Sequence, residues 1–449
     1  MNAYVESVIS GVKGRYAHQP EFIQAVEEVL RSLAPVVDRH PEYQQADLLG
    51  RMVEPERTFT FRVCWQDDNG NWHTNTGWRC QFNGAIGPYK GGLRFNKEVN
   101  LSVMKFLGFE QIFKNSLTGL PIGGGKGGSD FDPNGKSDSE IMRFCQSFMQ
   151  ALYRYIGPDV DVPAGDMGVG AREIGYLFGE YRRLKGNFEP GVLTGKGFSY
   201  GGSLIRPEAT GYGAVYYLQN VLRHEGENLK DKTIACSGFG NVAWGICRKA
   251  AELGAKVVTL SGPDGYIDDP DGVSTREKIE YMLEMRASGR NRVQDYADKF
   301  GVEFFPGEKP WGVKVDICMP AAMQNDIHLE HARQLAANGV KYCIEVANMP
   351  CTNEALIYMM NETPIVVAPS KAVNAGGVAV SALEMSQNSE RLVWPAEEVD
   401  GHLRDIMANI YQMSVDAAAQ YGLGYNLVAG ANIAGFLRVA EAMMAQGVF

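Results

Sequence analysis

One lysine stands among five glycines between Leu120 and Asp130, where the sequence reads LPIGGGKGGSD. Glycine suits a backbone that takes positive φ or lies close to a ligand, so we expect a loop that holds Lys126 beside a bound molecule. Burial and nearby positive charge both favour the neutral form of a lysine, which makes it usable in catalysis near neutral pH. Taken alone, the stretch also fits a flexible loop with a solvated lysine.

Two further lysines are expected to meet this loop. The motif GPYKGGLRF places Lys90 between residues that allow close approach of the backbone. A helix predicted over residues 100–117 carries Gln111 and Lys114 three residues apart, so these side chains share one face. The helix leads directly into the glycine-rich loop and brings Lys114 close to Lys126. Lys90 reaches the same place from the preceding loop if the domain is compact.

An aspartate completes this group of candidate residues. The motif VPAGDMGVG places Asp166 between glycines, in a loop that leads to a helix predicted from Arg172 to Arg183. An aspartate in such a place often caps a helix or stabilises a turn. Three lysines and an aspartate, all on glycine-rich loops of one domain, are harder to explain as turn residues. We therefore interpret them as a candidate site.

The elements that must position these residues indicate two domains. A chain of 449 residues is too long for one ordinary hydrophobic core. Residues 1–56 show helical periodicity, and the second helix is expected to start near Pro20. From Arg57 the pattern favours strands, with a hairpin turn at DDNGN. Residues 191–213 are rich in glycine and serine, and we place the inter-domain hinge there.

The second half contains a dinucleotide-binding pattern. A strand over residues 232–237 is followed by GFGNVA, a helix from Val242 to Leu253, and a strand over 256–261. This arrangement is the dinucleotide-binding fingerprint in its proper context, because the glycines let the backbone approach a pyrophosphate at the helix N-terminus. The residues expected to contact the cofactor here are Gly238, Phe239, Gly240, Asn241, Val242 and Ser261.

The end of the second of these strands bears on the choice between NAD and NADP. An acidic residue there suits a ribose 2′-hydroxyl, and a basic one suits a 2′-phosphate. The sequence SGPDGYIDDPD ends the strand in neither, but the turn over residues 264–271 carries four aspartates and no lysine or arginine. We therefore expect NAD to be preferred, with NADP as the alternative.

Later segments complete an α/β pattern. Strand-like runs at 315–319, 342–346 and 365–368 alternate with helices, as a doubly wound sheet requires, and a later helix carries Ser381. Two closing helices, at about 396–421 and 429–446, are expected to return to the first domain. The predicted organisation is a substrate-binding and oligomerisation domain (1–200), a Rossmann-like dinucleotide-binding domain (201–424) and a C-terminal helix that packs back on the first domain (425–449).

Composition narrows the expected partners and location. The net charge is −10 and no dense cluster of Lys and Arg occurs, so nucleic acid is not an expected partner. The eight cysteines show no CxxC pair and no metal-ligand spacing, which indicates a reducing compartment and no metal site. The N-terminus has no apolar signal region and no window of about 18 apolar residues occurs, so we expect a cytoplasmic protein without a membrane anchor.

Taken together, the motifs resemble those of the hexameric glutamate dehydrogenases, in particular the short clostridial type. The resemblance covers essentially the whole chain and rests on GPYKGGLRF, LPIGGGKGGSDFDP, VPAGDMGVGAREIGY, RPEATGYG, GFGNVAWG, EVANMP and KAVNAGGVAVSALEMSQN, in the family's order and spacing. It implies a homohexameric enzyme that interconverts L-glutamate with 2-oxoglutarate and ammonium, using NAD or NADP.

The resemblance also implies roles for individual residues. Lys126 would polarise the 2-carbonyl or its attacking water, and Asp166 would move protons to and from ammonia and the carbinolamine. The other implied residues are grouped by what they would contact: Lys114, Gln111 and the backbone at Gly92 for the 1-carboxylate; Lys90 and Ser381 for the distal carboxylate, in a pocket shaped by Ala164, Thr194 and Val378; Arg206 in the cleft; Thr210, Asn241, Asn348 and Asn374 on the cofactor side.

Two alternatives remain open at this point. Dehydrogenases of branched-chain or aromatic amino acids resemble this chain in fold and catalytic pair, but have apolar residues in place of Lys90 and Ser381. A buried lysine without a carboxylate partner is costly, which favours a dicarboxylate substrate. The second alternative is a non-catalytic nucleotide-binding regulator, against which the intact Lys126 and Asp166 argue. The chain also has Ala322 and Met323 where its nearest relatives tend to carry Cys and Thr, which would alter packing beside the cofactor cleft.

Overall fold

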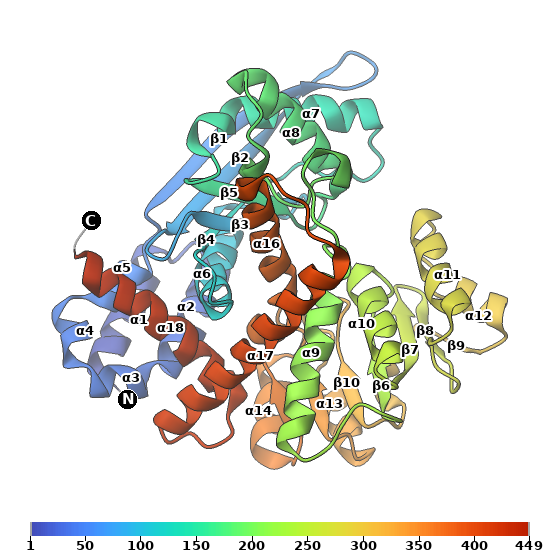
Figure 1. Cartoon of the computed structure of the whole chain (residues 1–449). Coiled ribbons are helices and arrows are strands. Elements are labelled where there is room, and N and C mark those ends of the chain that lie inside the picture. The colour runs from blue at the N-terminus through green and yellow to red at the C-terminus, as the bar shows by residue number, and fades with distance from the viewer. Residues whose placement is uncertain (1, 448–449) are drawn as a thin grey trace.

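In the computed structural model, which describes residues 2–447, the chain forms two lobes (Figure 1). The first lobe is built on a five-stranded sheet of order β1-β2-β4-β3-β5. Antiparallel pairing joins β1, β2 and β4, and parallel pairing joins β4, β3 and β5. The strands are β1 (Arg57–Gln66), β2 (Trp72–Asn83), β3 (Tyr89–Phe95), β4 (Gly123–Ser129) and β5 (Asp161–Gly165).

The glycine-rich segment around Lys126 is a strand, and the prediction of a loop was wrong. The residues of β4 are fully buried between β2 and β3, and none of its glycines has positive φ. A Cβ on Gly124 would lie 2.9 Å from the backbone of Ile112, and one on Gly91 of β3 would overlap the carbonyl oxygen of Gly125. Glycine is required here because a helix and a neighbouring strand approach closely. Lys90 likewise lies on a strand, β3, and not on a loop.

Helices cover both faces of this sheet. On one face lie the N-terminal helices and α6 (Leu101–Leu117), and on the other α7 (Asp138–Leu152) and α8 (Ala171–Lys185). The predicted helix over 100–117 is confirmed, with the Asn100 side chain accepting a hydrogen bond from the Val103 N–H. The remaining N-terminal helices are α1 (Ala3–Arg15), α2 (Pro20–Ser32), α3 (Ala34–Arg39), α4 (Pro41–Gln45) and α5 (Leu48–Met52), and α2 begins at Pro20 as predicted.

The second lobe contains a seven-stranded sheet of order β12-β11-β10-β6-β7-β8-β9. Strands β12 to β7 in this order are parallel, and β8 and β9 add an antiparallel edge. The strands are β6 (Thr233–Cys236), β7 (Lys256–Gly262), β8 (Gly265–Asp268), β9 (Glu303–Pro306), β10 (Ile317–Met319), β11 (Tyr342–Ile344) and β12 (Val366–Ala368). The doubly wound sheet is confirmed, but the segment interpreted as an acidic turn contains β8, and β9 was not predicted.

The helices of this lobe pack around the sheet. They are α9 (Ala209–His224), α10 (Asn241–Glu252), α11 (Arg276–Ala287), α12 (Gln294–Phe300), α13 (Leu329–Ala337), α14 (Asn353–Glu362) and α15 (Ser370–Val373). Strand β6 lies between β7 and β10. The chain adds β7, β8 and β9 on one side of β6 and then β10, β11 and β12 on the other, so the strand order reverses at β6. Ligands of open α/β sheets bind at the carboxyl ends of the strands at such a point.

Three long helices join the lobes: α16 (Gly376–Glu390), α17 (Ala396–Gln420) and α18 (Leu427–Gln446) (Figure 1). Helix α17 packs mainly on α9 of the second lobe, so the prediction that it returns to the first domain was wrong for most of its length. Helix α18 packs on α6 and α2 of the first lobe as predicted, and the predicted two-domain α/β fold class is confirmed. By length and composition alone α18 could cross a membrane, but more than half of its apolar window is buried inside the fold. Its apolar character is that of a core helix.

Candidate active site

A cleft between the two lobes brings together most of the residues predicted from the sequence. From the first lobe it is lined by Lys90, Gly92, Gln111, Lys114, Lys126, Ala164 and Asp166. From the hinge and the second lobe it is lined by Arg206, Thr210, Val242, Asn348, Asn374, Val378 and Ser381. The predicted residues Gly238, Phe239, Gly240, Asn241 and Ser261 do not line this cleft, and lie at the β6–α10 turn and the end of β7.

Lys126 and Asp166 form an ion pair in the cleft. The Lys126 Nζ lies 3.2 Å from Asp166 Oδ2, and the Arg94 Nε donates to the same oxygen at 2.8 Å. Burial lowers the pKa of the Lys126 amine, and the carboxylate of Asp166 opposes that shift. Burial alone would raise the pKa of the Asp166 carboxyl, but Lys126 and Arg94 together hold it well below its ordinary value. The arrangement is a partly buried acid–base pair of the kind that can transfer protons to and from a substrate.

Arg94 is a site residue that the sequence analysis missed. It belongs to the quoted motif GPYKGGLRF, at the end of β3, but only Lys90 and the backbone at Gly92 received roles from that motif. Gly92 of the same strand makes the contact possible, because a Cβ there would lie 2.8 Å from the Asp166 Cβ. The motif therefore places three site residues, Lys90, Gly92 and Arg94, on one strand.

The α6 residues sit beside this pair. Lys114 keeps partial exposure to the cleft, and burial together with the charge of Lys126 lowers its pKa to about 8. The Gln111 Nε2 donates to Asn115 Oδ1 at 2.6 Å. Glu110 also lines the cleft, and burial raises the pKa of its carboxyl. The predicted proximity of Lys114 to Lys126 is thus reproduced by the fold.

Lys90 lies in a deeper part of the cleft. Its side chain is 1% exposed, and Nζ donates to Thr194 Oγ1 at 2.6 Å and to the Val162 carbonyl at 3.2 Å. Burial and the charge of Arg206 place its pKa well below the ordinary value. The Ser381 hydroxyl donates to the Gly377 carbonyl within α16 at 3.0 Å. A buried lysine with two neutral partners is suited to receive an anionic group, whose charge would favour the protonated form of the lysine.

Two buried polar atoms of cleft residues, Arg206 Nε and Asn374 Oδ1, lack partners among the described residues. The Asn374 Nδ2 donates to Asn348 Oδ1 at 2.9 Å and to the Val346 carbonyl at 3.1 Å, which fixes the Asn348 side chain at the cleft wall. Buried polar groups are normally satisfied, so these atoms fit a polar ligand in the cleft.

The β6–α10 turn fits a dinucleotide. Gly238 has φ +84°, and its N–H donates to the Ser261 hydroxyl at 2.9 Å, so the turn is tied to the end of β7. A Cβ on Gly240 would meet nothing within 4 Å, and no side chain caps the first turn of α10 in the described chain. The helix N-terminus therefore has both room and free N–H groups for a pyrophosphate.

The acidic segment after β7 differs in part from the prediction. Asp264 accepts hydrogen bonds from the N–H groups of Val293 and Gln294, both at 3.0 Å, and so remains at the end of β7. Asp269 is buried and paired with Lys278 at 2.6 Å, so its charge is neutralised locally. The same contacts bring Arg292, the residue before Val293, near the strand end. The sequence could not show this cation, because it lies about thirty positions further along the chain.

A doubly wound nucleotide lobe that faces buried lysines and an acid–base pair defines a dinucleotide-dependent dehydrogenase acting on a small anionic substrate. The chain belongs to the Glutamate/Leucine/Phenylalanine/Valine dehydrogenase family. The family model matches residues 201–447, and the model of its dimerisation domain matches residues 55–183.

Individual relatives extend over the full chain. The chain is 70% identical over 448 residues to the NAD-specific glutamate dehydrogenase of Clostridium symbiosum, covering 100% of both, and 52% identical to the NADP-specific glutamate dehydrogenase of Haemophilus influenzae, covering 100% of this chain and 99% of the relative. A solved glutamate dehydrogenase superposes with a TM-score of 0.99 at 70% identity over 100% of both chains. A hetero-hexameric glutamate dehydrogenase from Thermus thermophilus superposes with a TM-score of 0.84 at 26% identity, over 96% and 98% of the two chains.

Proposed function

We infer that this chain catalyses the oxidative deamination of L-glutamate to 2-oxoglutarate and ammonium, and the reverse reductive amination, with NAD as the cofactor. The observation that carries this inference is the arrangement of cations in the cleft. Lys114 stands beside the Lys126–Asp166 pair, and Lys90 lies in a deeper part of the same cleft, where it donates to Thr194. A substrate with two carboxylates, one near its reacting carbon and one distal, matches two separated ammonium groups.

The residues divide the work as follows. Lys114, with Gln111 and the backbone at Gly92, holds the 1-carboxylate, and Lys90 with Ser381 holds the distal carboxylate. The small side chain of Ala164 leaves space in this pocket, and Val378 forms its wall on α16. This clamp fixes the Cα of glutamate next to Lys126 and Asp166, and so replaces rotational freedom by a defined orientation.

Proton transfer belongs to the Lys126–Asp166 pair. Bound NAD supplies the hydride acceptor for the Cα hydrogen. The Lys126 amine, whose pKa burial lowers, takes a proton from the water that adds to the iminium carbon. Its ammonium form then stabilises the developing 2-carbonyl oxygen. Asp166 takes a proton from the ammonium group of the substrate before hydride transfer and returns it to the amine of the carbinolamine, and the hydroxyl proton then leaves with ammonia as ammonium. Arg94 keeps the Asp166 carboxylate ionised at the start of this sequence.

The cofactor is bound by the second lobe. The turn at Gly238, Phe239 and Gly240 and the first turn of α10, with Asn241 and Val242, would receive the pyrophosphate. Thr210, Asn348 and Asn374 would line the nicotinamide side of the cleft, and Ser261 would lie by the adenosine ribose. The carboxylate of Asp264 at the end of β7 supports a preference for NAD over NADP, since it disfavours a 2′-phosphate.

A dehydrogenase of an apolar amino acid on the same fold is the second candidate. An aliphatic or aromatic side chain placed against the Lys90 ammonium would leave a buried charge without a counter-ion, which is unfavourable. Relatives named for glutamate, at 70% identity, also support a dicarboxylate substrate.

We further propose a homohexamer that works in the cytoplasm. The match to a dimerisation-domain model and the likeness to a hexameric structure support self-assembly. All eight cysteines are free, which suits a reducing compartment. The domain boundaries at 200 and 424 remain part of this proposal. Val192 and Leu193 belong to a first-lobe core, Ala209 belongs to the second-lobe core, and most of α18 packs in the first lobe.

The test is an initial-rate assay of the purified protein with NADH, ammonium and 2-oxoglutarate, repeated with the 2-oxo acids of leucine, phenylalanine and valine. We expect turnover with 2-oxoglutarate at a kcat/KM at least about 10³-fold above the others. Lys126→Ala should lower kcat by about 10³-fold while NADH binding, measured by fluorescence titration, is unchanged. Comparable turnover of an apolar 2-oxo acid would overturn the assignment of substrate.

A further inference from the structure

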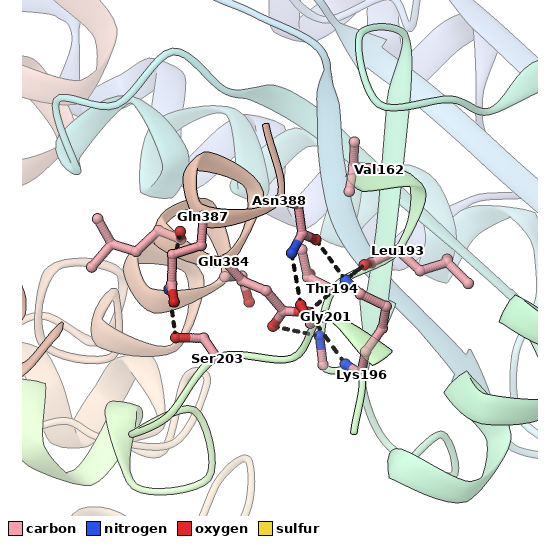
Figure 2. A network of polar contacts seen from close by, with 12 residues as sticks. Val162, Leu193, Thr194, Lys196, Gly201, Ser203, Glu384, Gln387 and Asn388 are labelled. Carbon is pink, nitrogen blue, oxygen red and sulfur yellow. Dashed lines mark hydrogen bonds and ion pairs between the residues drawn. The ribbon is translucent and has the colours of Figure 1, made fainter. Parts of the chain in front are cut away.

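The helix that carries Ser381 has a second buried polar group one turn further on. Glu384 stands three residues after Ser381 on α16, so both side chains lie on adjacent turns of one face. Glu384, Gln387 and Asn388 all bond to the segment 193–203, which is the first half of the predicted hinge (Figure 2). The proposed function uses Ser381 but assigns no role to this cluster.

The centre of the cluster is an ion pair between Glu384 and Lys196 with no exposed side-chain surface. The Lys196 Nζ donates to Glu384 Oε1 at 2.7 Å, to Asn388 Oδ1 at 2.9 Å and to the Leu193 carbonyl, so all three of its protons are used. The carboxylate also accepts the N–H of Gly195 at 3.0 Å and the N–H of Lys196 at 3.3 Å. A buried pair adds little net stability because both ions lose their water, so it is better explained by the geometry that it fixes.

The ion pair fixes the position of the backbone at residues 194–196. Residues 194–196 are held by Glu384 on one side, and on the other side the Thr194 hydroxyl receives the Lys90 ammonium at 2.6 Å. The Thr194 N–H donates to the Pro163 carbonyl at 3.1 Å, which ties this backbone to β5. Glu384 therefore connects the helix of Ser381 to the wall that holds Lys90.

The charge of Glu384 also favours a role for this residue at the Lys90 pocket. The charged groups that face Lys90 are Arg206, Arg79 and Lys196, which are cations, and Glu384, which is an anion. Arg79 is neutralised by its own buried pair with Asp161. Glu384 is thus the carboxylate that supports the protonated form of Lys90 from across the hinge.

We propose that Glu384, through its pair with Lys196, is a positioning residue that sets the spacing and charge of Lys90 relative to Ser381, and so determines selection for a distal carboxylate. This inference rests on the proposed function, because it assigns the Lys90 pocket to that carboxylate. It predicts an effect on substrate choice from a residue that contacts no substrate.

The experiment compares L-glutamate with L-norvaline (2-aminopentanoate), which has the same five-carbon chain without the distal carboxylate. For Glu384→Gln we expect kcat/KM for glutamate to fall by about 100-fold, mainly through KM, while kcat/KM for norvaline changes by less than about threefold. NADH binding should stay at the wild-type value. Equal falls for both substrates, or no change for either, would overturn the proposal.

A double variant keeps the test valid if Glu384→Gln leaves Lys196 as an unpaired buried charge and the protein then fails to fold. Lys196→Met combined with Glu384→Met removes both charges at similar side-chain volume, so no buried ion is left unpaired. We expect it to fold and to lose the same discrimination between glutamate and norvaline. Wild-type discrimination in this variant would contradict the proposal. Glu390→Gln, an exposed position at the end of α16, serves as the control and should leave both substrates unaffected.

A pH profile supplies a readout that a purely structural role would not move. With Glu384 neutral, Lys90 loses the anion that opposes Arg206, Arg79 and Lys196, so it should lose its proton at a lower pH. The alkaline limb of kcat/KM for glutamate should move down by about one pH unit, and that for norvaline should not move. Identical alkaline limbs in the wild type and Glu384→Gln would overturn the proposal that Glu384 supports the protonated form of Lys90. Absence of glutamate turnover in the wild type would instead contradict the proposed function itself.

Discussion

Two glycine-rich segments, one in each lobe, use glycine for different physical reasons. In β4 and β3 the glycines have ordinary extended φ, and they allow α6 and adjacent strands to approach so closely that Lys126 and Lys90 are buried. In the β6–α10 turn Gly238 takes φ +84° and Gly240 leaves open space. The first segment builds a rigid, charged wall before any substrate arrives, and the second leaves backbone N–H groups free for a ligand. Glycine content alone does not distinguish a strand from a loop.

The difference between the two glycine-rich segments can be tested first at Lys90, which the glycines of β3 and β4 help to bury. Lys90→Met keeps the length of the side chain and removes its charge, so the distal carboxylate would enter a site with no ammonium to receive it. We expect kcat/KM for glutamate to fall by about 10³-fold, with NADH binding unchanged. Steady-state kinetics with varied glutamate provide the measurement. A fall below tenfold would mean that Lys90 does not hold the distal carboxylate.

Close packing of the strands leads to the next largest effect. Gly91→Ala forces a Cβ into the Gly125 carbonyl, and Gly125 is a strand neighbour that has no flexible side chain to move away. We expect a loss of about 3 kcal/mol in the free energy of unfolding, measured by denaturant titration with activity and fluorescence as probes. Gly11→Ala in α1, where a Cβ would meet nothing within 4 Å, is the control and should be neutral or stabilising.

At the other glycine segment the same substitution should act on the ligand. A Cβ on Gly240 clashes with no protein atom, so Gly240→Ala should fold normally. Because this glycine faces the proposed pyrophosphate, we expect KM for NAD to rise by about tenfold, with KM for glutamate unchanged. A loss of stability similar to that of Gly91→Ala would remove the distinction between the two segments.

The electrostatics of the wall can be adjusted through Arg94. Its guanidinium helps to hold the pKa of the Asp166 carboxyl low, so its removal should raise that pKa. A carboxylate with a higher pKa is protonated at higher pH, and the acid limb of kcat/KM should therefore move upward in Arg94→Gln by about one pH unit. Arg62→Gln, an exposed substitution on β1, should leave the limb in place. An unmoved limb in Arg94→Gln would show that Lys126 alone sets the ionisation of Asp166.

The smallest effect concerns the cofactor. Asp264→Ser removes the negative charge at the end of β7, with Arg292 nearby. The ratio of kcat/KM for NADPH to that for NADH should rise by about fivefold, as expected for a partly exposed single charge. Asp271→Ser, at an exposed position of the same segment, should leave the ratio unchanged. If both variants behave alike, general acidity and not Asp264 sets the preference.

Local patterns allowed much of the fold to be predicted from the sequence. The helix over 100–117, the hairpin at DDNGN and the β6–α10–β7 unit follow from periodicity, capping and turn residues that lie within a few positions of one another. The burial of β4 could not be inferred in this way, because its glycines carry no alternating pattern and the strand exists only through its neighbours β2 and β3.

Site residues could be predicted where the reactive side chain and the glycines around it stand in one short motif. Lys126, Asp166 and Lys90 each stand in a distinctive glycine-rich motif, and all of them line the cleft. The contacts that tune them join distant positions: Arg94 and Asp166 are 72 residues apart, and Lys196 and Glu384 are 188 apart. No local pattern reports such pairings, and only the folded chain brings them together.

The central claim is that Lys90 and Lys114 select a dicarboxylate, and the most direct measurement is the ratio of kcat/KM for L-glutamate to that for L-norvaline with NAD and the wild-type protein. The two substrates differ by the distal carboxylate alone. The account predicts a ratio above about 10³, because a site built around buried ammonium groups rejects a ligand that leaves one of them unpaired. A ratio below about ten would contradict it, and would indicate that the distal pocket does not hold a carboxylate.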